Sequence, residues 1–399
     1  MPTKYIRYLN IVLDCFKLFF YRKSILFFGG YYFPERKSEG YFQRIAAVDS
    51  NFPNILKIHI DMTSCSAWFA DNWILHPDAS TVVFNFCGTR KRKLFIMLCV
   101  VLLCLRYRRI YFHSVHSLTI GKFFWLLRVP FLSSVIDMHG VVPEEFRYHN
   151  DFYNAMVTER LEELAVKNAT IIICVTNAMK DYLQQKYRGN LKGEILIYPI
   201  SPHIPDLHWQ RNVTDKPIVI YAGGVQKWQQ APLMAQAMVQ QCDLCSYEIY
   251  TPNPVEFITL LPENYRSHAA FTFGCKTTEE LMKIYSRCQY GFILREDIVV
   301  NNVACPTKLV EYIATGIVPI VKSPAIGDFK KLNMRYISLD DFLCGKIPDE
   351  VTRKDMAEHN LEIYKQIHEK SINSANYLRE LLFSNSSANF FSIPSVLSR

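Results

Sequence analysis

The sequence lacks any apolar run long enough to cross a bilayer, and it lacks a cysteine pattern that would hold a metal. Its most apolar stretch, residues 94–105, is much shorter than the roughly twenty residues of a membrane-spanning helix. The twelve cysteines form no paired framework, and Cys242 and Cys245 have no second pair at zinc-like spacing. We expect reduced thiols in a cytosolic protein. A signal-peptide pattern is also missing, because Asp14 and Lys17 interrupt the apolar part of the first twenty residues.

Charged residues are scarce and unevenly placed. Only 21% of the 399 residues are charged and 50% are apolar, which fits a folded chain of two or three domains. The net charge is +8, and basic clusters occur at residues 22–23, 90–93 and 106–109. Such clusters suit an acidic substrate, an anionic membrane or a nucleic acid. Since no zinc-finger, RNP or basic-heptad pattern is present, nucleic acid is the least favoured partner.

The apolar stretch 94–105 has two interpretations. It predicts either a helix buried against a sheet or, because cations bracket it on both sides, a helix lying at an anionic membrane surface. A second set of apolar residues recurs at helical spacing near the start of the chain and allows the same two interpretations: Ile6, Leu9, Leu13, Phe16 and Phe20.

Apolar runs alternate with helix-like segments along most of the chain, which is typical of βα units with parallel sheets. The predicted strands fall into two series: 24–29, 55–60, 81–86, 110–113, 133–138 and 169–175, then 218–222, 247–250, 270–273, 290–294 and 317–321. A proline-bearing stretch separates them. We therefore predict an α/β protein with two Rossmann-like, doubly wound domains facing a central cleft. The predicted divisions are a first domain at 1–200, a linker at 201–217, a second domain at 218–380 and a tail at 381–399.

Residues 290–321 carry the most informative chemistry. A buried strand is followed by a polar loop and a helix that starts near Pro306 and ends near Gly316. Lys308 and Glu311 lie three residues apart, and hence on one face of this helix. A helix N-terminus with a lysine suits a phosphate, and a carboxylate one turn later suits a ribose diol. The alternative is a solvated ion pair on a surface helix.

The sequence of this segment resembles the family 4 retaining glycosyltransferases of the GT-B fold, in their bacterial surface-polysaccharide branch. The residues that carry the resemblance are Lys308, Glu311, Tyr312, Ala314, Gly316 and Pro319, with Leu294 to Asp297 and Ala304 to Pro306 before them. Three other segments match in the expected order: 219–228 with a glycine pair and Lys227, 135–145 with a His-Gly-x-x-Pro-Glu-Glu run, and 29–44 with the first glycine loop. The resemblance covers about residues 25 to 330.

The resemblance implies a set of site residues. His139 and Lys227 are the implied catalytic residues. The implied donor-binding residues are Gly223, Gly224, Lys227, Arg295, Glu296, Asn301, Asn302, Lys308 and Glu311. The implied acceptor or cleft residues are Gly29, Gly30, Gly40, Arg44, His113, Asp137 and Glu144.

Two departures from the family pattern stand out. Val303 occupies the place of a common glutamate, so Asn301, Asn302 or Glu296 must replace its contact with the donor sugar. Gly224 stands where many members have an arginine, which leaves Lys227 as the favoured cation on the diphosphate. A metal site at His113 has little support, and no Asp-x-Asp motif of metal-dependent enzymes occurs.

The resemblance implies transfer of a sugar, with retained anomeric configuration, from a nucleotide sugar to a saccharide acceptor. It implies neither a cofactor nor a metal. The basic first domain suits a lipid-linked glycan of capsule or O-antigen assembly, at the inner face of the cytoplasmic membrane. Two alternatives stay open: a nucleotide-sugar 2-epimerase of the same fold, which needs no acceptor, and a non-catalytic glycan-binding or scaffold homologue, which needs no diphosphate site.

Overall fold

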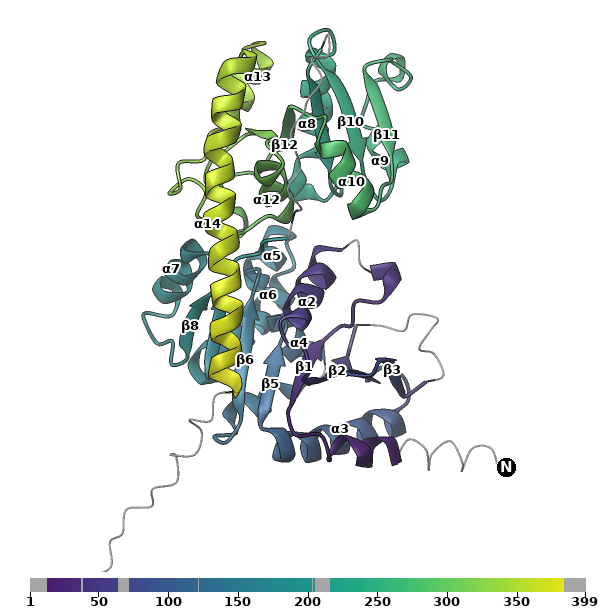
Figure 1. Cartoon of the computed structure of the whole chain (residues 1–399), viewed down its shortest axis with the longest axis vertical. Helices are drawn as coiled ribbons and strands as arrows, with labels where there is room; N and C mark the ends of the chain where they lie inside the picture. Colours follow the sequence, from purple (N-terminus) through teal and green to yellow (C-terminus); the bar gives the residue numbers. More distant parts are fainter. Residues whose placement is uncertain are drawn as a thin grey trace, which may run out of the picture.

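We analysed a computed structural model that describes residues 13–36, 39–63, 72–120, 122–202, 204 and 216–383. Figure 1 shows two α/β units stacked along the long axis of the molecule, with the first unit below and the second above. Ile6 and Leu9, most of the predicted linker and most of the predicted tail lie outside the described residues.

The first unit is built on a sheet that has eight strands within the described residues, in the order β3-β4-β2-β1-β5-β6-β7-β8. Only β3 runs antiparallel to its neighbour. The strands are β1 (Ser24–Gly29), β2 (Leu56–Asp61), β3 (Ile74–Asp78), β4 (Thr81–Asn85), β5 (Arg109–Phe112), β6 (Ser133–Met138), β7 (Ile171–Cys174) and β8 (Glu194–Ile197). The helices around it are η1 (Pro34–Arg36), α2 (Gly40–Ser50), α3 (Arg90–Tyr107), α4 (Val115–Ile120), η3 (Phe123–Arg128), α5 (Val142–Tyr148), α6 (Phe152–Asn168) and α7 (Asn177–Lys186).

The second unit has a parallel sheet of six strands within the described residues, in the order β11-β10-β9-β12-β13-β14. The strands are β9 (Ile218–Ala222), β10 (Ser246–Tyr250), β11 (Phe271–Gly274), β12 (Tyr290–Ile293), β13 (Val318–Val321) and β14 (Ile337–Ser338). The helices are η4 (Lys227–Gln229), α8 (Ala231–Gln240), α9 (Pro254–Ile258), η5 (Glu263–Tyr265), α10 (Thr278–Tyr285), α11 (Val299–Asn302), α12 (Thr307–Ala314), α13 (Leu339–Leu343) and α14 (Glu350–Phe383).

The predicted fold class is confirmed. Each of the eleven strands predicted from apolar runs corresponds to a strand of the structure, with ends shifted by up to a few residues. The prediction missed β3, β8 and β14. β3 carries exposed and half-buried residues, and β14 has only two residues, so neither forms an apolar run.

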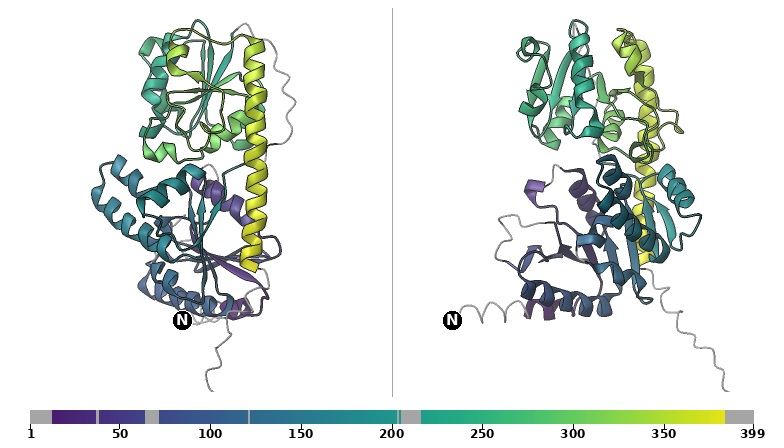
Figure 2. Two further views of the ribbon diagram at one scale, coloured as in Figure 1. Left: turned by 90° about the vertical axis from the view of Figure 1, so that its left-hand side faces the viewer. Right: turned by 180° about the vertical axis from the view of Figure 1, so that it is seen from behind.

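Helix α14 joins the two units, as Figure 2 shows. Its early residue Ala357 packs in the core of the second sheet, whereas Leu378 and Leu382 pack against the first sheet beside Phe27. The Ser374 hydroxyl also donates to the backbone oxygen of Ile197, at 2.7 Å. The predicted division at residue 380 stays a prediction, but the last turns of α14 contact the first domain and so tie the two domains together.

The eleven cysteines within the described residues are all free thiols. Cys242 and Cys245 are buried in the core of the second domain. They therefore pack in that core.

Candidate functional site

Both sheets reverse their strand order at a point where ligands bind in doubly wound folds. In the first sheet the reversal lies between β1 and β5, and in the second between β9 and β12. Ligands of open α/β sheets sit beyond the carboxyl ends of strands at such points. In the first domain Gly29 ends β1 and His113 follows β5, and in the second Gly223 follows β9 and Arg295 lies in the loop after β12.

The first glycine loop is packed tightly against its surroundings. A Cβ atom on Gly29 would lie 2.8 Å from the Tyr41 hydroxyl, and one on Gly30 would lie 2.6 Å from the Phe42 ring. The absence of side chains here therefore lets α2 approach the end of β1. Gly40 has open space around it, so packing does not explain its identity.

Arg44 and Asp137 form a buried ion pair below this loop. Arg44 Nε donates to Asp137 Oδ2 at 3.0 Å, and the Tyr111 hydroxyl donates to the same oxygen at 2.7 Å. Burial would raise the pKa of the Asp137 carboxyl, but the charges of Arg44 and His139 outweigh it and hold that pKa below its usual range. The two side chains neutralise each other and link β6 to α2, and their predicted contact with an acceptor stays a prediction.

His139 follows β6 and lies at the edge of this cluster. Its Nδ1 is 3.8 Å from Asp137 Oδ1, its ring centre is 5.6 Å from that of Tyr41, and 14% of its side chain is exposed. The Nδ1 atom has no hydrogen-bond partner within the described residues. His139 is therefore reachable from outside the core, as a residue that meets a substrate must be.

His113 has a different environment. Its ring is fully buried, stacks on Phe27 at 5.2 Å between ring centres, and has no hydrogen-bond partner among the described residues at either nitrogen. Burial lowers the pKa of His113 well below its usual value, so the ring is neutral at pH 7. In this structure His113 packs under the glycine loop, and its predicted contact with an acceptor stays a prediction.

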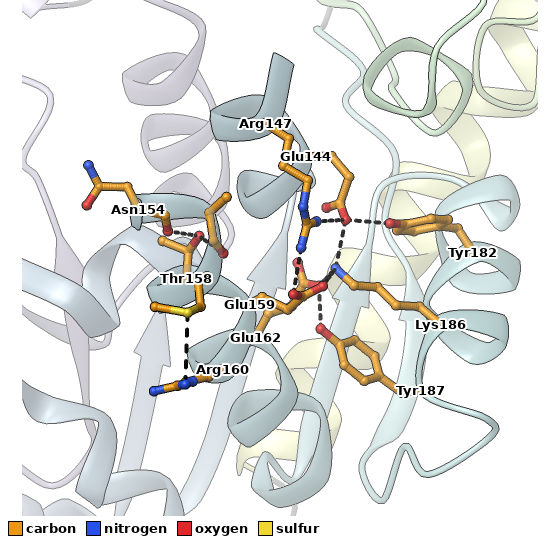
Figure 3. A network of polar contacts seen from close by, with 12 residues as sticks. Glu144, Arg147, Asn154, Thr158, Glu159, Arg160, Glu162, Tyr182, Lys186 and Tyr187 are labelled. Carbon is orange, nitrogen blue, oxygen red and sulfur yellow. Dashed lines mark hydrogen bonds and ion pairs between the residues drawn. The ribbon is translucent and has the colours of Figure 1, made fainter. Parts of the chain in front are cut away.

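Glu144 belongs to a network that holds three helices together, shown in Figure 3. Its Oε1 accepts from Arg147 at 2.8 Å, from the Tyr182 hydroxyl at 2.6 Å and from Lys186 at 2.9 Å. Lys186 also donates to the buried Glu162 at 2.7 Å. These contacts join α5 and α6 to α7, and the predicted contact of Glu144 in the cleft stays a prediction.

Glu145 is the carboxylate that the sequence did not single out. It lies against Gly140, where a Cβ atom would collide with its Oε1, and so beside the loop that carries His139. Burial raises the pKa of Glu145 above its usual value. Neighbouring residues of a helix point about 100° apart, so only one of two consecutive glutamates faces this loop. The Glu-Glu pair was visible in the sequence, but which one faces the loop was not.

In the second domain, the loop after β9 carries the glycine pair. The backbone N–H of Gly223 donates to the backbone oxygen of Tyr250 at 3.0 Å, and the Tyr221 hydroxyl donates to the backbone oxygen of Gly224. Lys227 follows on η4 with an exposed side chain. This arrangement fixes the glycine loop at the end of β9, and the exposed Lys227 follows it in the chain.

The loop after β12 carries a second cation and several amides. Arg295 Nη1 donates to Asn301 Oδ1 at 2.9 Å, and the Asn301 amide donates back to the Glu296 carbonyl at 3.0 Å. Arg295 Nε is buried without a partner among the described residues, and burial lowers the pKa of Arg295 to about 10. The Asn302 amide nitrogen donates to Asp297 Oδ1 at 2.7 Å. The buried Oδ1 of Asn302 has no hydrogen-bond partner among the described residues. The loop thus holds two buried polar atoms that no side chain among the described residues satisfies.

Helix α12 presents Lys308 and Glu311 as predicted, on one face. Lys308 Nζ lies 2.8 Å from Glu311 Oε2, and the Tyr285 hydroxyl donates to the same oxygen at 2.9 Å. Only 2% of the Glu311 side chain is exposed. The alternative of a solvated surface pair therefore does not fit, because the carboxylate is buried. Gly316 has φ +70° just after the helix, which explains the glycine at its end.

The two halves of the site meet through aromatic side chains. Lys227 Nζ lies 4.7 Å from the centre of the Tyr148 ring, and the Tyr148 hydroxyl donates to Glu296 Oε2 at 3.3 Å. His149 and Trp228 have their ring centres 5.3 Å apart. Residues after β6 in the first domain thus contact both the Lys227 and the Glu296 loops of the second. The sequence did not predict these contacts, because they join segments about 80 to 150 residues apart.

Among the described residues, no group of three or more His, Cys, Asp or Glu side chains could hold a metal ion. The predicted independence from metal concerns the reaction and stays a prediction.

Solved structures with the same architecture are numerous. Sucrose-phosphate synthase from Thermosynechococcus elongatus superposes with a TM-score of 0.64 and 14% identity, over 90% of this chain and 99% of that one. The fold is GT-B. HepE from Anabaena, solved with UDP and glucose, superposes with a TM-score of 0.63 and 14% identity, over 90% of this chain and 99% of that one. WaaG, a glycosyltransferase involved in lipopolysaccharide biosynthesis, superposes with a TM-score of 0.62 and 11% identity, over 90% of this chain and 100% of that one.

No protein-family profile and no curated protein sequence matches this chain. Identities of 11–14% establish the GT-B fold alone, and the fold does not determine an activity. The activity therefore has to be argued from the side chains of the site.

Proposed function

We propose that this protein is a retaining glycosyltransferase that moves a sugar from a nucleoside-diphosphate sugar to a saccharide acceptor. The observation that carries the proposal is the buried carboxylate of Glu311, with Lys308, beside strands whose loops supply Lys227 and Arg295. A nucleoside diphosphate needs cations for its phosphates and an acceptor of hydrogen bonds for its ribose. Both are present along one edge of the second sheet.

In the proposed reaction the donor's glycosidic bond breaks and negative charge grows on the leaving diphosphate. Lys227, Arg295 and Lys308 stabilise this charge, and electrostatic stabilisation of this kind usually contributes most to an enzyme's rate enhancement. His139 and the adjacent Glu145 lie in the first domain, where the donor sugar and the acceptor hydroxyl would meet. The acceptor oxygen bonds to the anomeric carbon on the face from which the diphosphate leaves, and its proton passes to that diphosphate. Because the new bond forms on the face of the old one, the configuration is retained.

We propose a lipid-linked glycan of surface-polysaccharide assembly as the acceptor, at the cytoplasmic side of the membrane. The basic clusters of the first domain support this assignment, since they suit an acidic lipid diphosphate and an anionic surface. None of the helices in the described residues has the length and hydropathy that crossing a membrane requires.

The test is a panel of nucleotide sugars incubated with the full chain, with and without saccharide acceptors, and followed by NMR. We expect slow release of nucleoside diphosphate from one donor alone, and faster release with an acceptor that gains the sugar. Conversion of the donor to its 2-epimer without an acceptor would support the epimerase instead. Failure to bind any nucleotide sugar would support a non-catalytic homologue.

A further inference from the structure

Helix α3 is apolar on two opposite faces, and only one of them is buried. Ile96, Val100 and Leu103 pack in the core of the first domain. Leu94 and Leu98 are 71% and 57% exposed, and Leu102 and Leu105 are exposed as well. At 100° per residue, these four leucines lie within about 80° of the helix circumference. They form one continuous apolar stripe on the outside of the protein.

The helical segment 13–18 lies beside α3 and extends the stripe. Cys15 Sγ is 3.4 Å from Cys99 Sγ, and Arg106 Nε donates to the backbone oxygen of Phe19 at 3.2 Å. Phe16 and Phe20 are 61% and 70% exposed. Solvent-facing apolar residues of α3, of the segment 13–18 and of the turn after it thus make up one surface. We call it the stripe face: Leu13, Phe16, Phe20, Leu94, Leu98, Leu102 and Leu105.

Cations surround the stripe face. Helix α3 contains no acidic residue, and its exposed polar residues are basic. The only carboxylate of the segment 13–18 is Asp14, which pairs with Lys17 at 3.2 Å. The exposed cations near the stripe are Lys17, Arg22, Lys23, Arg90, Lys91, Lys93, Arg106 and Arg108.

We propose that the stripe face docks the protein on the surface of an anionic lipid bilayer, with the leucines and phenylalanines inserted between headgroups. Apolar residues flanked by cations are what an interfacial helix presents to acidic lipids. A second copy of the chain fits less well, because an isologous contact would bring two sets of cations together. The inference deepens the proposed function and rests on it only for the nature of the acceptor.

The stripe face lies far from the second domain, where the nucleotide sugar is proposed to bind. In Figure 1, α3 lies at the end of the first domain farthest from the second domain. Docking there leaves the second domain in water, where a soluble nucleotide sugar reaches it.

The test measures binding of the full chain to vesicles by flotation. Wild-type protein should float with phosphatidylcholine–phosphatidylglycerol vesicles and much less with phosphatidylcholine alone. The double variant Leu94→Gln/Leu98→Gln should lower the partition coefficient roughly tenfold or more, because these side chains no longer gain from leaving water. Arg90→Gln/Lys91→Gln/Lys93→Gln should lower it roughly fivefold for each cation removed.

The matched control is Val255→Gln/Val351→Gln, which changes two equally exposed apolar residues of the second domain and should leave vesicle binding unchanged. Equal flotation of Leu94→Gln/Leu98→Gln and wild type would overturn the inference. It would also be overturned if the wild type binds no vesicles but forms a dimer, and this variant is a monomer. Nucleoside-diphosphate binding, measured without lipid on the same samples, separates this inference from the proposed function. A chain that floats but binds no nucleotide refutes only the function, and one that binds nucleotide but never floats refutes only the docking.

Discussion

The ammonium group of Lys227 lies 4.7 Å from the centre of the Tyr148 ring, so a cation of the second domain rests on an aromatic side chain of the first. The same tyrosine reaches Glu296 through its hydroxyl. An exposed cation–π contact contributes only about 0.5–1 kcal/mol. A diphosphate can therefore compete with the ring for Lys227, and the contact marks where the two domains approach each other.

Replacing Lys227 by Ala should lower kcat by roughly 10²–10³, because its interaction with the diphosphate strengthens as the glycosidic bond breaks. Steady-state kinetics of the two separate variants Lys227→Ala and Tyr148→Leu distinguish this role from domain contact. Tyr148→Leu removes the ring but keeps the cation, so kcat should change much less. If both variants lower kcat by the same factor, Lys227 acts only through its contact with Tyr148.

Transfer should survive excess EDTA, because Lys227, Arg295 and Lys308 supply the positive charge at the diphosphate. The measurement compares initial rates before and after chelation, with fresh magnesium or manganese added back. A loss of activity that either metal restores would contradict the roles given to these three cations.

Arg44→Met should destabilise the protein by about 3–5 kcal/mol, because it leaves the buried Asp137 carboxylate without its counter-charge. Denaturant unfolding measures this loss of stability. The control is Lys276→Met, which removes one partner of the exposed ion pair with Glu280 and should lower the free energy of unfolding by at most about 1 kcal/mol. The double variant Arg44→Met/Asp137→Asn should cost less than the sum of its single variants. An Arg44→Met protein as stable as the control would show that the pair contributes nothing.

The same pair predicts a pH dependence. The pKa of Asp137 is lower in the folded chain than in the unfolded chain, where it is about 3.9. Such a carboxyl contributes stability above its unfolded pKa, and the contribution is lost as the pH falls through the folded pKa. The stability difference between wild type and Asp137→Asn should therefore be constant near pH 7 and shrink below about pH 4. A difference that stays unchanged in acid would contradict the ion pair.

The apolar strands were predictable from the sequence because each one is a short buried run, and the two series of runs indicated two sheets. The site was predictable where one local segment carries it, as in the Lys308–Glu311 pair three residues apart. Contacts between distant segments were not predictable. Arg44 and Asp137 satisfy each other across 93 residues, and Glu144 meets Lys186 on another helix. The resemblance pointed to Arg44, Asp137 and Glu144, but only the fold shows which side chains they pair with.

The sequence did not show which residues of the apolar stretch 94–105 face outward. The helix is buried against the sheet along one face and exposed along the other, because nearly every position in the stretch is apolar. A sequence that is apolar all round carries no periodicity that tells which residues face outward. The position of the segment 13–18 beside α3 was likewise invisible in the sequence.

The central claim is that Glu311 holds the ribose of a nucleoside diphosphate, and calorimetric titration of a panel of nucleoside diphosphates tests it most directly. The wild-type protein should bind one of them, and Glu311→Ala should weaken that binding by roughly 1.5–3 kcal/mol, the size of a hydrogen bond to a charged group. Tyr285→Phe, which removes a donor to Glu311 but keeps the carboxylate, is the matched control and should bind more tightly than Glu311→Ala. If folded Glu311→Ala binds the nucleotide as tightly as the wild type, Glu311 is only the buried partner of Lys308 and Tyr285, and the proposed donor site is wrong.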